Sequence, residues 1–300
     1  MTQDGSGAQS RLLDVLARLR LPEALIHDSA SIAPLPAPDQ LWRLLWGSSA
    51  AVGIVREVHE DTLEMCPVTF VPDEATQSAH LLPATSNTLG MELVAWVNLT
   101  RAFPVFTLER HLGDLVPRQA GPKDWLSEPG PTGMPILGPQ EPRIILEAEL
   151  QDRLQDIAEA SWVPQGDGTL HKALRASGVF PSELAQLLGV PLPTALGIQR
   201  GQLPVDDQMA AALGPRIGLT VTGVLARNPA PPVELQRELN KPARRAALWA
   251  TRRSVNESEV VTRRRAAASV YTLAARESTA EPSGWVDRVD RYLQVAGQAP

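Results

Sequence analysis

The sequence predicts an α+β protein, with a β-rich module behind an N-terminal helix and an all-helical C-terminal half. Short alternating apolar stretches between turn residues fill residues 39–116, which is typical of strands. Beyond residue 143, apolar residues recur at helical spacing instead. Residues 117–142 lie between the two parts and hold seven prolines and four glycines in 26 residues, which predicts an exposed linker.

The composition excludes several classes of protein. Of the 300 residues, 43% are hydrophobic and 21% are charged, as in ordinary globular proteins, and the length suits about two domains. The one cysteine, Cys66, excludes an intrachain disulfide framework and a multi-cysteine zinc site. No apolar stretch approaches the ~20 residues of a membrane span, and the N-terminus lacks a signal-peptide pattern. We therefore expect a cytoplasmic protein without a membrane partner.

The front of the chain is predicted to hold one helix and then several strands. In residues 1–38, leucines at helical spacing predict an amphipathic helix over 11–28, and the prolines of PLPAP then form a linker. In the module of residues 39–116, strands are predicted at 51–58 and 63–71, joined by a turn. Shorter strands are predicted at 80–83 and 103–108. This spacing indicates a small barrel or sandwich.

The C-terminal half divides into two predicted helical parts, 143–227 and 228–300, at the proline-rich segment 228–232. The first part begins with a helix predicted over 143–162, whose apolar face carries Leu146, Leu150, Leu154 and Ile157. The second part is predicted to hold a helix over 242–253, a helix opened by Asn256 with Glu259 as a capping pair, and a helix with Trp285, Val289, Tyr292 and Leu293 on one face.

Charge is distributed unevenly along the chain. Residues 1–165 carry 11 Lys and Arg against 22 Asp and Glu, whereas residues 234–276 carry 10 against 4. A basic segment behind an acidic half is typical of a polyanion partner that binds one part only. The alternative is that the basic helices are solvated or pair with acidic residues of the same chain.

The sequence shows no recognisable catalytic motif. The five histidines lack metal-motif spacing such as H-E-x-x-H, and neither a phosphate-binding loop nor a nucleophile elbow occurs. The acidic residues around Glu60 and Asp61 look like a turn and its flanks. We therefore expect no enzyme activity, no catalytic residue, no metal site and no cofactor.

Residues 170–219 carry the strongest pattern in the chain. A helix-turn-helix needs a small residue where its helices touch, a glycine at the turn and apolar residues that lock both helices. Here Ala185 is the small residue, and Gly189 is the turn glycine, which adopts a positive φ at little cost. The locking residues are Leu184, Leu188, Val190 and Ile198.

This stretch resembles the Xre/lambda-repressor-like family. The family's L-A-x-x-L-G-V pattern stands here as residues 184–190, and its I-x-R-G ending stands as residues 198–201. The resemblance implies a fold whose second helix enters the major groove of DNA. A plain helical bundle with a coincidental L-G-V turn is the alternative.

The residues expected to contact DNA are one hydroxyl residue and six cations. At the start of the second helix only Thr194 can hydrogen-bond to a base edge, because prolines, a leucine and a glycine fill the other reading positions. Three consecutive arginines, 263–265, span about 200° of a helix, so at least one or two should face solvent or a polyanion. The candidate set is Lys172, Arg175, Thr194, Arg200, Arg263, Arg264 and Arg265.

Residues 39–115 resemble the MazF/PemK-like toxins, whose fold is a small SH3-like barrel. The match lies in residues 41–46, 66–69 and 108–115. The resemblance implies a ribonuclease site with an arginine and a hydroxyl residue. Thr69 fits the hydroxyl, but Gly47-Ser48-Ser49-Ala50 stands where the arginine is needed, so we expect this activity to be lost. A barrel that packs or senses is the alternative.

Two functional hypotheses result. In the first, the protein is a bacterial-type helix-turn-helix transcriptional regulator or antitoxin-like repressor, which binds double-stranded DNA as a homodimer and senses a partner through its acidic β-rich module. In the second, it is a protein-interaction adaptor that keeps the helix-turn-helix scaffold without reading DNA. Proteins that resemble this motif often work beside toxins or IrrE-like metallopeptidases, so the resemblance implies a protein partner of either kind.

Overall fold

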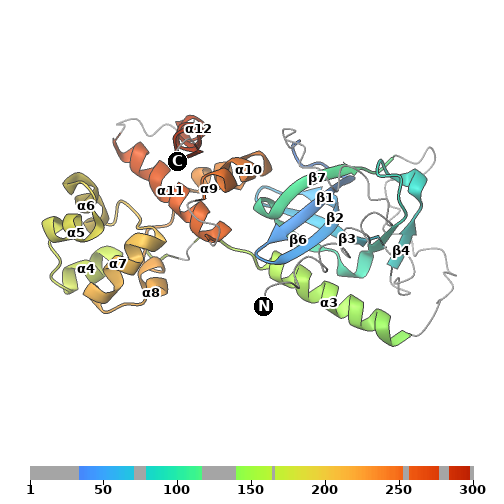
Figure 1. Cartoon of the computed structure of the whole chain (residues 1–300), viewed down its shortest axis with the longest axis horizontal. Helices are drawn as coiled ribbons and strands as arrows, with labels where there is room; N and C mark the ends of the chain where they lie inside the picture. The colour runs from blue at the N-terminus through green and yellow to red at the C-terminus, as the bar shows by residue number, and fades with distance from the viewer. Residues whose placement is uncertain are drawn as a thin grey trace, which may run out of the picture. The chain divides into compact units, whose positions relative to one another are not determined.

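The computed structural model of the chain (Figure 1) describes residues 34–70, 79–116, 140–163, 166–252, 257–276 and 284–297, without the side chains of 140–143 and 275–276. The helix predicted over 11–28, the helix start at Asn256 and residues 117–139 of the predicted linker lie outside these ranges. Contacts divide the chain into two units. Unit 1 comprises Met1–Leu44, Ala50–Phe103 and Leu108–Gln155, and unit 2 comprises Leu45–Ser49, Pro104–Thr107 and Asp156–Pro300.

The β-rich part is an antiparallel sheet. Among the described residues it has seven strands in the order β4-β5-β3-β2-β1-β7, with β6 paired to β3. The strands are β1 (Gln40–Trp46), β2 (Ser49–Val58), β3 (Thr62–Thr69), β4 (Ala79–Leu82), β5 (Leu93–Trp96), β6 (Arg101–Pro104) and β7 (Leu108–Asp114). Three 3-10 turns, η2 (Ala84–Ser86), η3 (Val97–Leu99) and η4 (Val105–Thr107), lie between strands. With the helices of the C-terminal half, this sheet makes the protein α+β, as the sequence predicts.

The hairpin predicted across Glu60 and Asp61 is present as β2 and β3. Its register pairs Val58 with Leu63 and Glu57 with Glu64. A bulge interrupts the ladder between Val55 and Glu57. Prediction missed β5, whose four residues are all buried and therefore do not alternate. The strand predicted over 103–108 is divided, because η4 separates β6 from β7.

Aliphatic side chains of the sheet form the core of unit 1. Its members are Leu41, Ile54, Cys66, Val68, Leu82, Leu93, Ala95 and Leu112. Two buried tryptophans satisfy their indole N–H groups within the sheet: Trp42 donates to Gln40 Oε1 at 2.9 Å and Trp96 donates to Thr69 Oγ1 at 3.1 Å. Burial of these rings with their N–H groups paired avoids the cost of an unsatisfied donor.

The helix predicted over 143–162 is present as α3 (Gln140–Ala158), with Leu150 and Leu154 buried. Within unit 1, Asn98 Nδ2 donates to Glu147 Oε1 at 2.8 Å and Arg101 Nη1 donates to Gln155 Oε1 at 2.9 Å. The predicted division assigns this helix to the helical half. In the structure the boundary between the units falls inside α3, after Gln155, so most of α3 belongs with the sheet.

Five short helices of unit 2 form what we call the α4–α8 module. They are α4 (Leu170–Ala176), α5 (Pro181–Leu188), α6 (Leu192–Gln199), α7 (Asp207–Ile217) and α8 (Val221–Leu225). In this module α6 packs on α4 and α5, and α7 packs on α5 and α8. Their apolar faces enclose one core that includes Leu170, Leu174, Leu184, Ile198 and Leu213.

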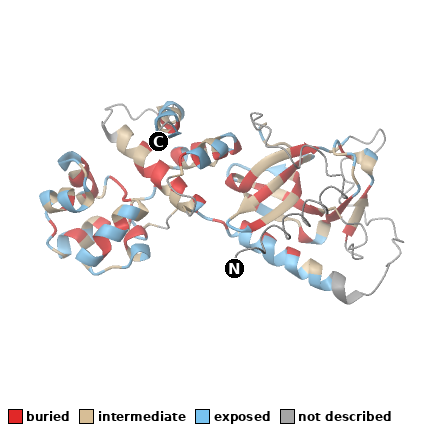
Figure 2. Ribbon diagram, in the orientation of Figure 1, coloured by how far each residue is buried: buried red, intermediate tan, exposed pale blue. Residues whose placement is uncertain are grey.

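The remaining helices surround α11. They are α9 (Val233–Asn240), α10 (Pro242–Ala250), α11 (Glu259–Arg276) and α12 (Gly284–Gly297), of which α9 was not predicted. Figure 2 shows a nearly continuous buried stretch in α11, which contacts α7, α9, α10 and α12. Trp46 and Phe106, from the two short segments that belong to unit 2, pack into the same core. Even so, no helix among the described residues is long and apolar enough to cross a membrane.

Candidate interaction surface

A tight turn at Gly189 joins α5 to α6. Gly189 has φ +63°, and the N–H of Val190 donates to the carbonyl of Ala185 at 3.1 Å, which closes the end of α5. Leu184 and Ile198 are buried on the facing sides of the two helices. The two helices and the positive φ therefore occur where the sequence predicts them.

Polar contacts fix this helix pair to its neighbours. Gln199 Nε2 donates to the carbonyl of Val179 at 2.8 Å. Arg216 Nε of α7 donates to Glu183 Oε1 of α5 at 2.5 Å, and this hydrogen bond lowers the pKa of Glu183 below its ordinary value. Gly197 lies so close to the side chain of Leu203 that a Cβ on residue 197 would stand 2.6 Å from Leu203 Cδ1. These contacts connect α6 to the segment between α4 and α5, and α5 to α7.

Thr194, the predicted base-reading residue, does not face solvent. Its side chain belongs to the inner face of α6, with Ala195 and Ile198, and only 8% of the residue is exposed. The helical period decides this, because residues three or four positions apart share a face and Ile198 is locked in the core. The prediction that Thr194 is available to a base edge is wrong.

Large apolar side chains occupy the exposed side of the same helices. Phe180 precedes α5 and is 69% exposed, Leu187 near its end is 38% exposed, and Leu192 at the start of α6 is 50% exposed. Phe180, the extended residue before α5, and Leu187 are seven residues apart, which is about two helical turns. We call Phe180, Leu187 and Leu192 the apolar face. Pro191 and Pro193 beside Leu192 are also exposed.

Three of the predicted phosphate contacts remain accessible in the α4–α8 module. Lys172 and Arg175 are exposed on α4, and Arg200 is exposed where α6 ends. None of the three forms a hydrogen bond or an ion pair through its side chain with the residues that the structure describes.

Arg263, by contrast, lies fully inside unit 2. Its Nε donates to Glu259 Oε1 at 2.9 Å and its Nη1 to the carbonyl of Leu239 at 2.6 Å. Burial lowers the pKa of Arg263 to about 10, so the guanidinium remains charged at neutral pH. A side chain with no exposed surface cannot reach a phosphate, so this predicted DNA contact is wrong.

Arg245 approaches the same carboxylate from α10. Its Nη2 lies 2.5 Å from Glu259 Oε2, its Nη1 donates to the carbonyl of Thr107 at 2.7 Å, and its Nη2 also donates to the carbonyl of Leu45 at 2.7 Å. We call Arg245, Glu259 and Arg263 the arginine cluster. Its two cations share one carboxylate, and backbone carbonyls accept from Nη atoms of both arginines, whereas Arg245 Nε has no acceptor among the described residues.

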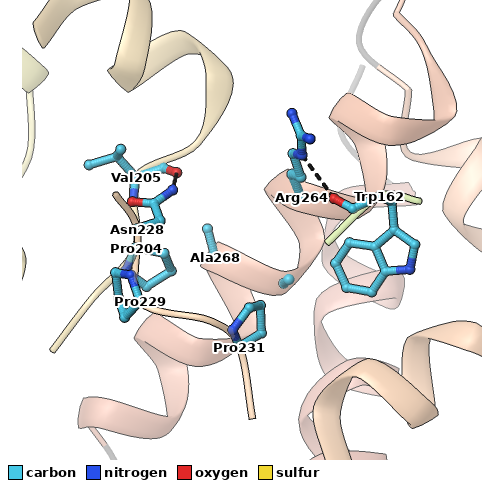
Figure 3. A pocket seen from close by; sticks show the side chains of 9 residues that line it. Trp162, Pro204, Val205, Asn228, Pro229, Pro231, Arg264 and Ala268 are labelled. Atoms are coloured by element: carbon cyan, nitrogen blue, oxygen red, sulfur yellow. Dashed lines mark hydrogen bonds between the residues drawn. The ribbon is translucent and has the colours of Figure 1, made fainter. Parts of the chain in front are cut away.

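The other two arginines of the run are also engaged by the protein. Arg265 is 6% exposed, pairs with Glu257 and donates to the carbonyl of Thr251, so its predicted DNA contact is wrong too. Arg264 Nε donates to the carbonyl of Trp162 at 2.9 Å (Figure 3), and its Nη1 lies 3.4 Å from Asp207 Oδ1. Of the three, Arg264 alone keeps part of its side chain exposed, so the expectation that at least one or two of them face solvent or a polyanion is met only by Arg264, because other helices surround α11.

Arg264 borders a small pocket beside α11 (Figure 3). The lining residues are Trp162, Pro204, Val205, Asn228, Pro229, Pro231, Arg264, Ala267 and Ala268. The side-chain amide of Asn228 forms two hydrogen bonds with the backbone of Val205. Its Nδ2 donates to the carbonyl at 2.7 Å, and its Oδ1 accepts from the N–H at 2.9 Å. The free space of about 10 Å³ has room for about one water molecule and is far smaller than a ligand pocket.

The residues that suggest a toxin-like site are buried or hydrogen-bonded within the sheet. Thr69 accepts the indole hydrogen bond of Trp96, and Cys66 is fully buried. Burial raises the pKa of Cys66 to about 11, so its thiol stays protonated at neutral pH. Neither residue offers an activated nucleophile in this arrangement.

One group that could bind a ligand was missed from the sequence. Potential ligand atoms of Glu57, His59 and Glu64, at the end of the β2–β3 hairpin, all lie within 4.8 Å of one another. No spacing motif marks this group, because Glu64 joins the other two only through the strand register.

Comparison with known proteins identifies no relative: no protein-family model matches the chain, and no curated protein or solved structure is significantly similar to it.

Proposed function

We propose that the protein is an adaptor that binds a partner protein through the apolar face of a helix-turn-helix scaffold. One observation carries this proposal: Phe180, Leu187 and Leu192 expose large apolar side chains around α5 and α6, and Leu192 stands at the start of α6, where a DNA-reading protein needs polar residues. Apolar groups at the centre of a protein interface, with charged groups around them, are the usual arrangement of a docking surface.

The scaffold is part of the proposal. We infer that α5, Gly189 and α6 form an Xre-like helix-turn-helix, supported by their bounds, by the positive φ of Gly189 and by the packing of α6 on α4 and α5. We likewise infer an SH3-like barrel for the sheet, supported by its short antiparallel strands and the bulges between β1 and β7.

The chemistry of the surface defines the partner. Full burial of a Leu or Phe side chain is worth about 1.5–3 kcal/mol, so covering these three half-exposed side chains would contribute about 2–5 kcal/mol, and other contacts must supply the rest of the binding energy. The accessible cations Lys172, Arg175 and Arg200 belong to the same module. The proposed partner therefore presents an apolar segment with acidic residues around it. A toxin or an IrrE-like metallopeptidase is the class that the family resemblance implies.

A DNA-binding regulator remains the second candidate, favoured by the same three cations. With Thr194 buried and Arg263 and Arg265 occupied, such binding would depend on phosphate contacts and would discriminate little between sequences. It would also weaken steeply with salt. This dependence separates the second candidate from the first.

The test compares two pairs of exposed apolar residues. Leu187→Ser/Leu192→Ser changes the apolar face, and Val286→Ser/Val295→Ser changes residues of α12 that are at least as exposed, as the control. Tagged full-length proteins are recovered from the native cells, and bound proteins are quantified by mass spectrometry. A partner that is retained by the control but lost from the face variant is then purified and titrated. The adaptor proposal predicts at least tenfold weaker binding for the face variant alone.

The DNA arm uses a random-sequence duplex at two salt concentrations. Three outcomes together would support the regulator instead. The wild type would bind this duplex with a steep salt dependence, the face variant would bind it equally well, and the triple variant Lys172→Gln/Arg175→Gln/Arg200→Gln would not bind it. If all captured proteins are equally retained by the face variant, the adaptor proposal is refuted.

A further inference from the structure

We propose that Glu57, His59 and Glu64 form a binding site for a divalent transition-metal ion of the zinc class. The inference is independent of the proposed adaptor function, since these residues belong to the β2–β3 hairpin of unit 1 and the apolar face belongs to unit 2.

The geometry of the hairpin brings three different ligands together. Glu57 and His59 are two residues apart, so the strand period directs both to one face, and Glu64 is the direct partner of Glu57 on β3. The N–H of His59 donates to the carbonyl of Thr62 at 2.9 Å, which continues the ladder as far as the histidine. The ring is therefore attached to a hydrogen-bonded backbone position.

The ligand atoms are already near coordination distance. His59 Nδ1 lies 3.9 Å from Glu57 Oε1, and the three potential ligand atoms lie within 4.8 Å of one another. Bonds of about 2.0–2.2 Å to zinc place two ligand atoms at most about 4 Å apart. Because the three side chains are wholly or partly exposed, small rotations about their torsions can bring the atoms onto one ion.

The carboxylates at this end of the hairpin repel each other, and a bound cation would relieve that repulsion. Like charges directly opposite each other on antiparallel strands are destabilising, and Glu57 faces Glu64 in this way. Residues 56–64 carry four acidic side chains and one basic one, Arg56. Arg56 Nη1 is 3.5 Å from Glu64 Oε1, and both side chains are substantially exposed, so this pair offsets little of the repulsion.

The donor set selects the kind of ion. Calcium and magnesium favour all-oxygen sites, whereas an imidazole with carboxylates suits zinc and its neighbours in the first transition row. Three protein ligands leave the fourth tetrahedral position of zinc to water or to a ligand from a partner. A bound ion would also remove the repulsion between Glu57 and Glu64, so it should stabilise unit 1.

The experiment separates coordination from attraction by charge alone. Zinc is titrated calorimetrically into the full-length wild type, Glu57→Gln, His59→Asn and Glu60→Gln. His59→Asn removes a ligand and leaves the carboxylates unchanged, whereas Glu60→Gln removes a carboxylate of the same turn that is outside the trio. Loss of a metal contact should weaken binding at least about tenfold in Glu57→Gln and His59→Asn, while Glu60→Gln should stay near the wild type.

Two further readouts keep the result independent of folding. Metal-free thermal unfolding should be similar for wild type and His59→Asn, since His59 is exposed, and zinc should raise the midpoint of the wild type only. Cobalt should give the visible absorption of a tetrahedral site in the wild type and lose it in His59→Asn. Zinc binding by His59→Asn at wild-type strength, or equal weakening by Glu60→Gln and Glu57→Gln, would overturn the proposal.

Discussion

Replacing Glu259 by glutamine should be among the most damaging single substitutions in unit 2. The carboxylate of Glu259 is the shared counter-ion of Arg245 and Arg263, at 2.5 Å and 2.9 Å. Glutamine has nearly the same shape but carries no charge. Its amide N–H₂ group replaces one carboxylate oxygen, so an N–H donor then faces a guanidinium donor where the carboxylate offered an acceptor. Two buried guanidinium groups then share one amide oxygen and the backbone carbonyls, and neither has a counter-ion.

The structure sets the size of the effect. Arg245 is 3% exposed and Arg263 is fully buried, so water cannot replace the lost carboxylate. Removing one partner of a buried ion pair costs about 3–5 kcal/mol. For a unit of this size, each kcal/mol lowers the unfolding midpoint by about 2–4 °C, so Glu259→Gln should lower it by about 6–20 °C.

The assay is thermal and urea unfolding followed by far-ultraviolet circular dichroism, which reports mainly on helices. Glu183→Gln is the matched control, because Glu183 pairs with Arg216 at 2.5 Å but both side chains are 39% exposed. It should remain close to the wild type. Adding Arg245→Met to Glu259→Gln removes one unpaired charge, so the double variant should lose less stability than the sum of the two single variants.

Equal stability of Glu259→Gln and the control would refute the reasoning. It would mean that the amide oxygen of the glutamine and the backbone carbonyls of Leu45, Phe106, Thr107 and Leu239 suffice for both arginines, and that the charge of the carboxylate contributes no net stabilisation.

Three other predictions concern single residues elsewhere in the chain. Cys66 should react with a thiol reagent at pH 8 only on unfolding, because burial raises its pKa to about 11; rapid labelling of the native protein would contradict this. Gly197→Ala should cost about 1–3 kcal/mol in urea unfolding, because its Cβ would meet Leu203; an unchanged midpoint would show that Leu203 moves aside freely. Burial raises the pKa of Asp207 above its ordinary 3.8, so ionised Asp207 disfavours the fold, and Asp207→Asn should be more stable than wild type at pH 7. That advantage should shrink as the pH falls through the raised pKa and vanish below 3.8, and an advantage that is constant with pH would refute it.

Elements set by local pattern were predictable from the sequence. The hairpin around Glu60 and Asp61 follows from alternation and a turn, and α5 with Gly189 follows from helical spacing and a glycine that must adopt positive φ. The helix α9 escaped prediction because only Leu235 and Leu239 in it are fully buried apolar residues, too few to establish a period.

The burial of the arginines in unit 2 could not be predicted from the neighbouring residues in the sequence. In the sequence alone, solvent and polyanions are the only visible destinations for the guanidinium groups of residues 263–265. The partners of Arg263 instead include the carbonyl of Phe106, which is 157 residues away in the sequence. Thr194 failed for a related reason, because a polar residue near a helix start can face either side and only packing decides which. Glu57, His59 and Glu64 come together only once the strand register is known.

The distance along the chain between Arg245 and its carbonyl partners has a consequence during synthesis. Leu45 and Thr107 precede Arg245 by 200 and 138 residues. At about 5–20 residues per second, a ribosome needs roughly 7–40 s after making those two residues to reach the arginine. During that interval the carbonyl acceptors exist without their donor. Final assembly of this core must therefore wait until Arg245 has been made, and a chaperone that shields nascent β-structure has that interval in which to act.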